Sequence, residues 1–166
     1  MDDFDRFFLE HYGRVVGSLR LACGDCGEVE DTAQEAFAKA MLRWQSVSAM
    51  DRPATWVYVV AVRELRRRLR SRDRSTSTEG TGTHAAAVDP ADAVVTAALI
   101  ETALAALPAR QRLAVVLRFH ADLSVREVAL AMRCSEGTVK STLHAALGRL
   151  RIDLDDERLE GAHDEC

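Results

Sequence analysis

A polar stretch in the middle of the chain constrains the fold most, because it separates two segments with helical patterning. Residues 75–84 read STSTEGTGTH and contain no apolar residue. Such a stretch buries too little apolar surface to offset the entropy lost on ordering, so we predict a flexible linker over residues 76–92. The sequence therefore predicts two small domains of roughly 60 to 80 residues each. They would cover residues 1–75 and 93–154, followed by an acidic tail at 155–166.

On both sides of the linker, apolar residues recur at steps of three and four, which is the period of an amphipathic helix. An all-α fold follows, in which Asp25 and Glu28 are expected to form a capping box and residues 45–52 a loop. The expected helices cover residues 4–22, 29–44, 53–74, 93–107, 108–120, 124–132 and 136–154. The buried stripe of the second helix is expected to contain Val29, Ala33, Phe37, Ala40, Met41 and Trp44.

Residues 124–150 have the pattern of a helix-turn-helix: a short helix, a three-residue turn and a longer helix. Ser124 and Glu127 would form a capping box, Ala129 is a small residue where the helices cross, and Val139 is an apolar anchor. Arg133 occupies a turn position that favours Gly, because a side chain at positive φ costs on the order of 1 kcal/mol. A plain helical hairpin is the competing interpretation.

The second helix of this motif has two distinct faces. The residues expected to point into the core are Val139, Leu143, Leu147 and Leu150. The opposite face is small and polar, as a surface that reads base edges in the major groove must be. Its candidate DNA-contacting residues are Glu136, Gly137, Thr138, Lys140, Ser141 and His144.

The net charge of −4 argues at first against a nucleic-acid partner, but its distribution along the chain does not. Residues 63–74 contain seven Arg and two acids, whereas residues 155–166 contain six acids and one Arg. These Arg residues can bind DNA phosphates, and neighbouring aromatic rings can stack on bases, so together they form a candidate DNA surface. The alternative interpretation is that the Arg residues only form a charged helix end exposed to solvent. The candidate residues are Trp56, Tyr58, Arg63, Arg66, Arg67 and Arg70.

Several other classes of protein are excluded or disfavoured. The longest apolar run, residues 56–62, is too short to span a membrane, and the acidic N-terminus is unlike a secretory signal. We therefore expect reduced cysteines in a cytoplasmic protein. Cys23 and Cys26 have the spacing of a zinc half-site or a redox pair, but no nearby His or Cys completes a zinc site. We expect them to be small packing residues, with no metal and no cofactor.

Four motifs together resemble the extracytoplasmic-function (ECF) RNA polymerase sigma factors, which consist of a region 2 and a region 4. They are residues 30–37 (EDTAQEAF, similar to "EDxxQEAF"), 52–58 (RPATWVY, similar to "RPxxWLY"), 107–112 (LPARQR, similar to "LPxRQR") and 136–141 (EGTVKS, matching "EGTVKS"). The resemblance covers about residues 4–74 and 93–152, in the family's order. Four linked motifs are far more specific than any one of them.

The resemblance implies a protein that is not an enzyme and that directs promoter-specific transcription initiation. Region 2 would bind core RNA polymerase and melt the −10 element, and region 4 would bind the −35 element. The implied partners are the β′ clamp helices and β flap of core polymerase, and promoter DNA. An anti-sigma factor is compatible with this interpretation, and no membrane insertion is implied. The residues implied in docking on the clamp are Asp31, Gln34, Glu35 and Phe37.

The chain also departs from the family pattern at positions that bear on DNA recognition. Arg63 and Arg67 stand where Asn and Asp are usual, and Thr142 and Ala145 stand where Arg is common. Details of −10 recognition and the phosphate contacts at −35 are therefore expected to differ. Two competing functions are a helix-turn-helix regulator that acts without polymerase docking, and a redox-responsive or metal-responsive helical protein built around the cysteine pair.

Overall fold

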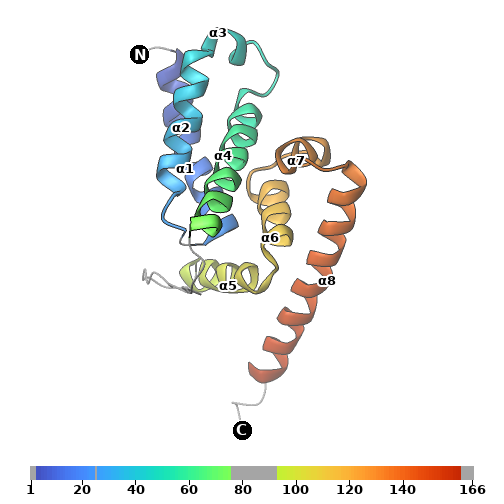
Figure 1. The fold of residues 1–166 in the computed structure, drawn as a ribbon. Helices are drawn as coiled ribbons and strands as arrows, with labels where there is room; N and C mark the ends of the chain where they lie inside the picture. Colours follow the sequence, from blue (N-terminus) through green and yellow to red (C-terminus); the bar gives the residue numbers. More distant parts are fainter. Residues whose placement is uncertain (1–2, 25, 76–92, 162–166) are drawn as a thin grey trace.

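The computed structural model describes residues 3–24, 26–75 and 93–161, and it describes side chains up to residue 71 and again from 98 to 151. All regular structure in these residues is helical, as the sequence predicts (Figure 1). The N-terminal helices are α1 (Asp3–Cys23), α2 (Val29–Leu42), α3 (Trp44–Val47) and α4 (Pro53–Ser75). The C-terminal helices are α5 (Ala93–Ala106), α6 (Ala109–Val115), a π-helical turn η1 (Val116–His120), α7 (Val125–Met132) and α8 (Glu136–Gly161). The predicted linker at 76–92 lies outside the described residues.

Helix boundaries differ from the predicted ones in three places. The first three residues of the predicted loop at 45–52 belong to the short helix α3, which begins at Trp44, and the helix predicted over 108–120 ends in the π-helical turn η1. Helix α8 continues past Leu154 into the segment predicted to be a tail. The prediction that Asp25 and Glu28 form a capping box at the start of α2 is wrong. The N-cap residue is Glu28, and no side chain caps the helix there.

The N-terminal helices enclose an aromatic core, in which α2 packs against both α1 and α4. The Phe37 ring packs against those of Phe7 and Phe8, with centroids 5.9 and 5.1 Å away. Met41, predicted to be buried, is instead 62% exposed. Ala40 takes the buried position of that helical turn, and the next residue is rotated by about 100° toward solvent.

The helix-turn-helix forms as predicted. The Ser124 side chain accepts from the Glu127 amide while the Glu127 carboxylate accepts from the Ser124 amide, which completes the capping box. Arg133 adopts φ 54°, the left-handed conformation expected for the turn, and Val139 is fully buried. Leu147, predicted to face the core, is 42% exposed, because Ala146 fills the buried position of that turn.

The two halves of the chain pack against each other rather than lying apart in the described structure. Helix α4 packs against α7, and α1 packs against α6 and η1 (Figure 1). Buried residues of both halves belong to one continuous hydrophobic core. In the part of the chain that the structure describes, no helix is both long and apolar enough to span a membrane.

Candidate polymerase and nucleic-acid interfaces

The first turns of α8 present the polar face that the sequence predicts. Five of the six candidate residues are exposed, and Thr138 is half-buried. The backbone amide of Thr138 donates to the Ser135 hydroxyl at 3.1 Å, so Ser135 caps the start of this helix. On the opposite side, Val139 anchors the helix in the core. The small polar face of α8 is therefore held rigidly and is open to solvent.

Two of the predicted DNA-contacting Arg residues of α4 are hydrogen-bonded to α7 instead. Arg63 donates to the carbonyl of Leu130 at 3.1 Å, and Arg66 donates to the carbonyl of Met132 at 2.6 Å. These carbonyls lie in the last turn of α7, where backbone acceptors lack partners within the helix and the helix dipole attracts cations. Burial, assisted by nearby Arg charges, lowers the pKa of Arg66.

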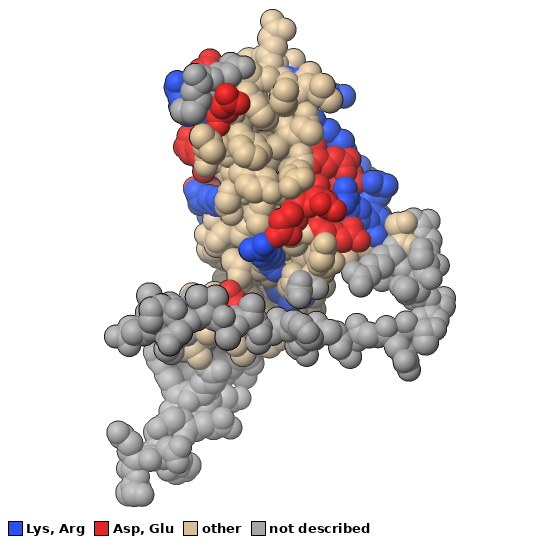
Figure 2. Space-filling view, turned by 90° about the vertical axis from the view of Figure 1, so that its left-hand side faces the viewer, with Lys and Arg blue, Asp and Glu red and all other residues tan. Residues whose placement is uncertain are grey.

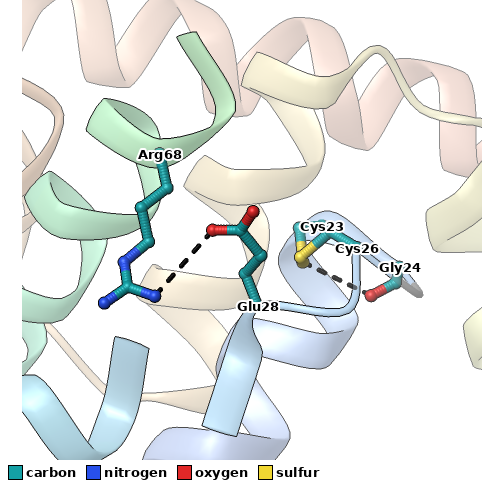
Figure 3. Close-up of a disulfide and its surroundings, with 5 residues drawn as sticks. All are labelled: Cys23, Gly24, Cys26, Glu28 and Arg68. Carbon is teal, nitrogen blue, oxygen red and sulfur yellow. Dashed lines mark hydrogen bonds and ion pairs between the residues drawn. A yellow bond between two sulfur atoms is a disulfide. The ribbon is translucent and has the colours of Figure 1, made fainter. Parts of the chain in front are cut away.

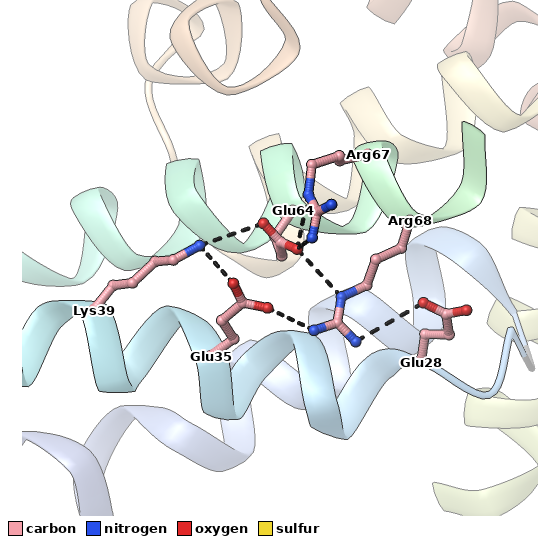
Figure 4. A network of polar contacts seen from close by, with 6 residues as sticks. All are labelled: Glu28, Glu35, Lys39, Glu64, Arg67 and Arg68. Carbon is pink, nitrogen blue, oxygen red and sulfur yellow. Dashed lines mark hydrogen bonds and ion pairs between the residues drawn. The ribbon is translucent and has the colours of Figure 1, made fainter. Parts of the chain in front are cut away.

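Arg67 belongs to a network of charged side chains that joins α4 to α2 (Figure 4). Its centre is the buried Glu64 carboxylate, which accepts from Arg67, from Arg68 at 3.3 Å and from Lys39 at 3.4 Å. Chiefly because of the Arg67 hydrogen bond, the pKa of Glu64 falls to about 2. Arg67 bonds Glu64 of its own helix and keeps a side chain that is 67% exposed, and Arg70, one turn further on, is exposed as well.

The aromatic residues at the start of α4 differ in exposure. Trp56 is half-buried, whereas Tyr58 is only 3% exposed and its hydroxyl lies 3.3 Å from Ser18 Oγ. Burial raises the pKa of Tyr58. Ser18 Oγ also lies 2.8 Å from Nδ1 of His120, in the C-terminal half of the chain. Tyr58 therefore belongs to the junction between the halves, and Trp56 is the more accessible ring.

Helix α2 exposes a face that combines polar and apolar side chains. Asp31 and Gln34 are exposed on it, and Met41 and Leu42 extend it with exposed fractions of 62% and 85%. Phe37 lies beneath this face in the core rather than on it. Figure 2 shows the side of the molecule where α1 and α2 lie: a broad uncharged surface with acidic and basic side chains intermingled at its edge.

Glu35, the fourth residue implied in docking, is half-buried beside the exposed face of α2. It pairs with Lys39 at 2.7 Å and with Arg68 at 2.6 Å. These hydrogen bonds lower its pKa, with the bond from Lys39 the largest cause. Glu35 therefore holds α2 to α4 as part of the charged network in Figure 4.

Glu127 links the capping box of α7 to the N-terminal half. Its carboxylate accepts from Arg52 Nη1 and from Thr55 Oγ1, both at 2.9 Å. Burial alone would raise the pKa of Glu127, but hydrogen bonds from Ser124 and Thr55 and the charge of Arg52 together lower it. Sequence spacing indicates the capping role of Glu127 but carries no signal for these tertiary partners, which lie more than 70 residues away.

A second polar contact joins α1 to the π-helical turn η1. The Arg14 guanidinium donates to the carbonyl of His120 at 3.0 Å. Burial, with a smaller effect of the Arg14 charge, lowers the pKa of the His120 imidazole. His120 is therefore favoured in its neutral form at this junction.

The structure joins Cys23 and Cys26 in a disulfide (Figure 3). The expectation that these cysteines are reduced packing residues is wrong for this structure. Their spacing and the intervening turn bring the two sulfur atoms together at the corner between α1 and α2. Among the described residues, no group of three or more His, Cys, Asp and Glu side chains is arranged to hold a metal ion.

Comparison with known proteins identifies the two halves. Residues 7–75 match the family described as Sigma-70 region 2, and residues 97–150 match Sigma-70, region 4. The ECF RNA polymerase sigma factor SigL of Mycobacterium tuberculosis is 33% identical over 142 residues, which cover 82% of this chain and 80% of the relative. The chain belongs to the ECF RNA polymerase sigma factors. SigW of Bacillus subtilis, another ECF sigma factor, is 32% identical over 147 residues, covering 80% of this chain and 79% of SigW.

Solved structures confirm the fold of this ECF sigma factor. The sigma factor RpoE of Bartonella quintana, in complex with the anti-sigma factor NepR, matches with a TM-score of 0.74 and 23% identity, covering 93% of this chain and 98% of RpoE. CnrH, in complex with the cytosolic domain of CnrY, matches with a TM-score of 0.60 and 20% identity, covering 92% of this chain and 88% of CnrH.

Family membership settles the function at the level of the family. The protein is not an enzyme; it binds RNA polymerase and directs promoter recognition. The prediction made from the four sequence motifs is confirmed at this level. A helix-turn-helix regulator without polymerase docking is thereby set aside, because the chain also contains region 2.

Proposed function

We propose that the exposed face of α2 is the surface that docks on the β′ clamp helices of core polymerase. Asp31 and Gln34 supply its polar part, and Met41 and Leu42 supply large apolar side chains that have no neighbour to cover them within the described residues. Exposed apolar side chains of this size, grouped on one helix face, favour a protein partner. The Glu64 network and the buried Phe37 hold this face in a fixed orientation.

We assign the exposed polar face of α8 to the −35 element. The proposed sigma function is best supported by the observation that this face is open to solvent while Val139 anchors the helix in the core. Lys140, Ser141 and His144 lie on it with no large apolar side chain between them. Helix N-termini bind phosphate through their first backbone amides, so the start of α8 suits a DNA phosphate. With Thr142 half-buried and donating to the Thr138 carbonyl at 2.7 Å, fewer side chains remain for phosphate contacts.

The start of α4 and the preceding residues 45–52 are assigned to the −10 element. Extruding a base from the duplex costs a few kcal/mol, which stacking and phosphate contacts must offset. Trp56 is the accessible ring, and Arg70 is an exposed cation on the same helix. Arg63 and Arg66 join this surface only when their guanidinium groups leave the carbonyls of α7.

We further propose that region 4 binds the β flap of core polymerase. The protein is assigned to the cytoplasm, where its polymerase acts. An anti-sigma protein is also proposed as a partner, since both structural neighbours were solved in complexes, one with a named anti-sigma factor and one with the cytosolic domain of CnrY. Such a partner would compete with polymerase for the apolar face of α2. A substitution that weakens polymerase binding at Leu42 is therefore expected to weaken this partner too.

Run-off transcription with core polymerase tests the −35 assignment, with DNA from upstream of the protein's own gene as the first template. Lys140→Ala is expected to lower promoter-directed transcript at least several-fold. The matched control is Arg149→Ala, which removes another exposed cation of α8. Arg149 lies about two and a half helical turns further on, and therefore on the opposite side of the helix from Lys140. Equal transcript from both variants would contradict the assignment.

Core-polymerase binding tests the α2 assignment independently of promoter sequence. Leu42→Asp places a charge at the most exposed apolar position of α2 and is expected to weaken binding at least tenfold. The control is Leu99→Asp, which makes the same change on α5, where Leu99 is 46% exposed. Wild-type affinity of Leu42→Asp would refute docking through this face.

A further inference from the structure

Cys23 and Cys26 form a disulfide, and the proposed function makes no use of it. Cys23 is the last residue of α1, and Cys26 lies two residues before the N-cap of α2 (Figure 3). We propose that this pair is a reversible thiol–disulfide site, exchanged by an external thiol/disulfide couple, and that its oxidation fixes the start of α2.

The backbone between the helices is built to bring the two cysteines together. Gly24 and Gly27 both adopt φ +69°. Residues with a side chain rarely adopt this conformation. An added Cβ at either glycine would meet no atom within 4 Å, so the backbone angle and not space requires glycine there. The resulting turn sets the Cα atoms of the cysteines 6.0 Å apart. This separation is within the usual range for a disulfide.

The turn also provides for the reduced state. Hydrogen bonds from the Gly24 amide to the Arg20 carbonyl (2.7 Å) and from the Cys26 amide to the Gly24 carbonyl (3.0 Å) hold it independently of the sulfur bond. Sγ of Cys23 lies 3.3 Å from the Gly24 carbonyl oxygen, which is the acceptor available to the thiol after reduction. These backbone bonds do not use the sulfur atoms, so reduction leaves their donors and acceptors in place.

The pair is accessible to a reagent. Both cysteines are half-buried rather than sealed in the core, and Gly27 beside them is exposed. Exchange requires a thiolate to attack one sulfur of the disulfide, so at least one sulfur must be reachable. Structural cysteines buried in apolar cores are inert by comparison.

The exchange is a two-electron step. In oxidation, the thiolate of one cysteine attacks an external disulfide, forms a mixed disulfide and releases one external thiol. The thiolate of the second cysteine then attacks the protein sulfur of the mixed disulfide and releases the second external thiol. The protein loses two electrons and two protons, and the external disulfide gains them. Reduction is the reverse and consumes two external thiol groups, which a dithiol such as dithiothreitol supplies in one molecule and leaves as its cyclic disulfide.

Oxidation acts on the helix that carries the proposed docking face, and this part of the inference rests on the proposed function. The N-cap residue Glu28 has no side-chain cap, and its ion pair with Arg68 is long at 3.9 Å. The disulfide ties the residue two positions before this weak helix start to the end of α1. Because an interface that is already ordered loses less entropy on binding, the oxidised chain should bind core polymerase more tightly.

The first test measures the thiols themselves. The full chain with Cys134→Ser and Cys166→Ser is equilibrated at graded ratios of reduced to oxidised dithiothreitol and treated with a maleimide that shifts its mobility on a gel. The expected result is a reversible two-thiol transition in folded protein, with folding checked by circular dichroism. A pair that never oxidises, or that becomes reducible only after unfolding in urea, would overturn the site.

The second test measures affinity for core polymerase in both redox states of the same protein. The oxidised form is expected to bind several-fold more tightly. Adding Cys23→Ser and Cys26→Ser should give the affinity of the reduced form under either condition. Equal affinities of the oxidised and reduced forms would overturn the coupling to α2. Wild-type affinity of Leu42→Asp would instead refute the docking face, and the coupling with it, while the thiol titration remains a separate result.

Discussion

The contact of Glu127 with Thr55 makes the packing of the two halves measurable in solution. The Thr55 hydroxyl donates to one carboxylate oxygen at 2.9 Å, and the Glu127 side chain is only 16% exposed. A hydrogen bond to a charged group contributes about 1.5–3 kcal/mol. Thr55→Val removes this donor at nearly constant volume and is expected to lower the free energy of unfolding by about 1–2 kcal/mol.

Removing the carboxylate charge affects a larger set of contacts. Glu127→Gln weakens the bonds from Arg52, Thr55 and the Ser124 amide together. The Arg52 side chain is 49% exposed, so water screens most of that ion pair. An exposed pair of this kind contributes at most about 1 kcal/mol. With about 1 kcal/mol from the capping box, the total loss for Glu127→Gln is expected to be about 2–3 kcal/mol.

A double-mutant cycle isolates the contact between the halves from these other losses. Urea unfolding of the wild type, both single variants and the double variant should give a coupling of about 1 kcal/mol between Thr55→Val and Glu127→Gln. The control cycle pairs Thr55→Val with Glu30→Gln, whose ion pair is with Arg20, and should be additive. Additivity in the first cycle as well would refute the conclusion that the halves pack together in solution.

Three further outcomes are expected from urea unfolding. Because the folded pKa of Glu64 is about 2 against an ordinary 4.5, its stabilisation is present above pH 4.5 and lost as the pH falls toward 2. Glu64→Gln should therefore flatten the acid side of the stability profile by about 3 kcal/mol, whereas an unchanged slope would contradict the network. Arg133→Gly should raise stability by about 1 kcal/mol by relieving the left-handed backbone, and a loss would show that the Arg133 side chain contributes more than its conformation costs. Val139→Ala should lower stability by about 2 kcal/mol, and a loss below about 0.5 kcal/mol would contradict its place in the core.

The helix-turn-helix could be predicted from the sequence because its determinants are local. Ser124 and Glu127 are three residues apart, as a capping box requires. Arg133 begins the short turn that separates the end of one helical pattern from the start of the next. Periodicity likewise places Val139 in the core. Periodicity gives the wrong burial for Met41 and Leu147. In each case the preceding alanine fills the buried position, and apolar character alone does not show which of two adjacent apolar residues is buried.

The partners of the candidate DNA-binding Arg residues could not be predicted, because they depend on contacts between distant segments. Sequence spacing places Arg63, Arg66, Arg67 and Arg70 along one helix but carries no information about carbonyls 66 and 67 residues away. The sequence does not predict the disulfide either. Reduced cysteines are expected because most cytoplasmic proteins lack disulfides, and that general tendency says nothing about one particular pair of cysteines. The local turn, with both of its glycines at positive φ, is what brings the sulfur atoms together.

The two proposed DNA surfaces are unequally available in this arrangement of the chain. The polar face of α8 is open to solvent, whereas the guanidinium groups of Arg63 and Arg66 are bonded to the end of α7. Each such bond is worth about 1.5–3 kcal/mol because the donor is charged. A DNA phosphate must therefore replace a carbonyl as acceptor, which leaves the last turn of α7 without partners for its own backbone oxygens. Engagement of the −10 element through these two residues is thus expected to require that α7 move away from α4, while contact of α8 with the −35 element does not.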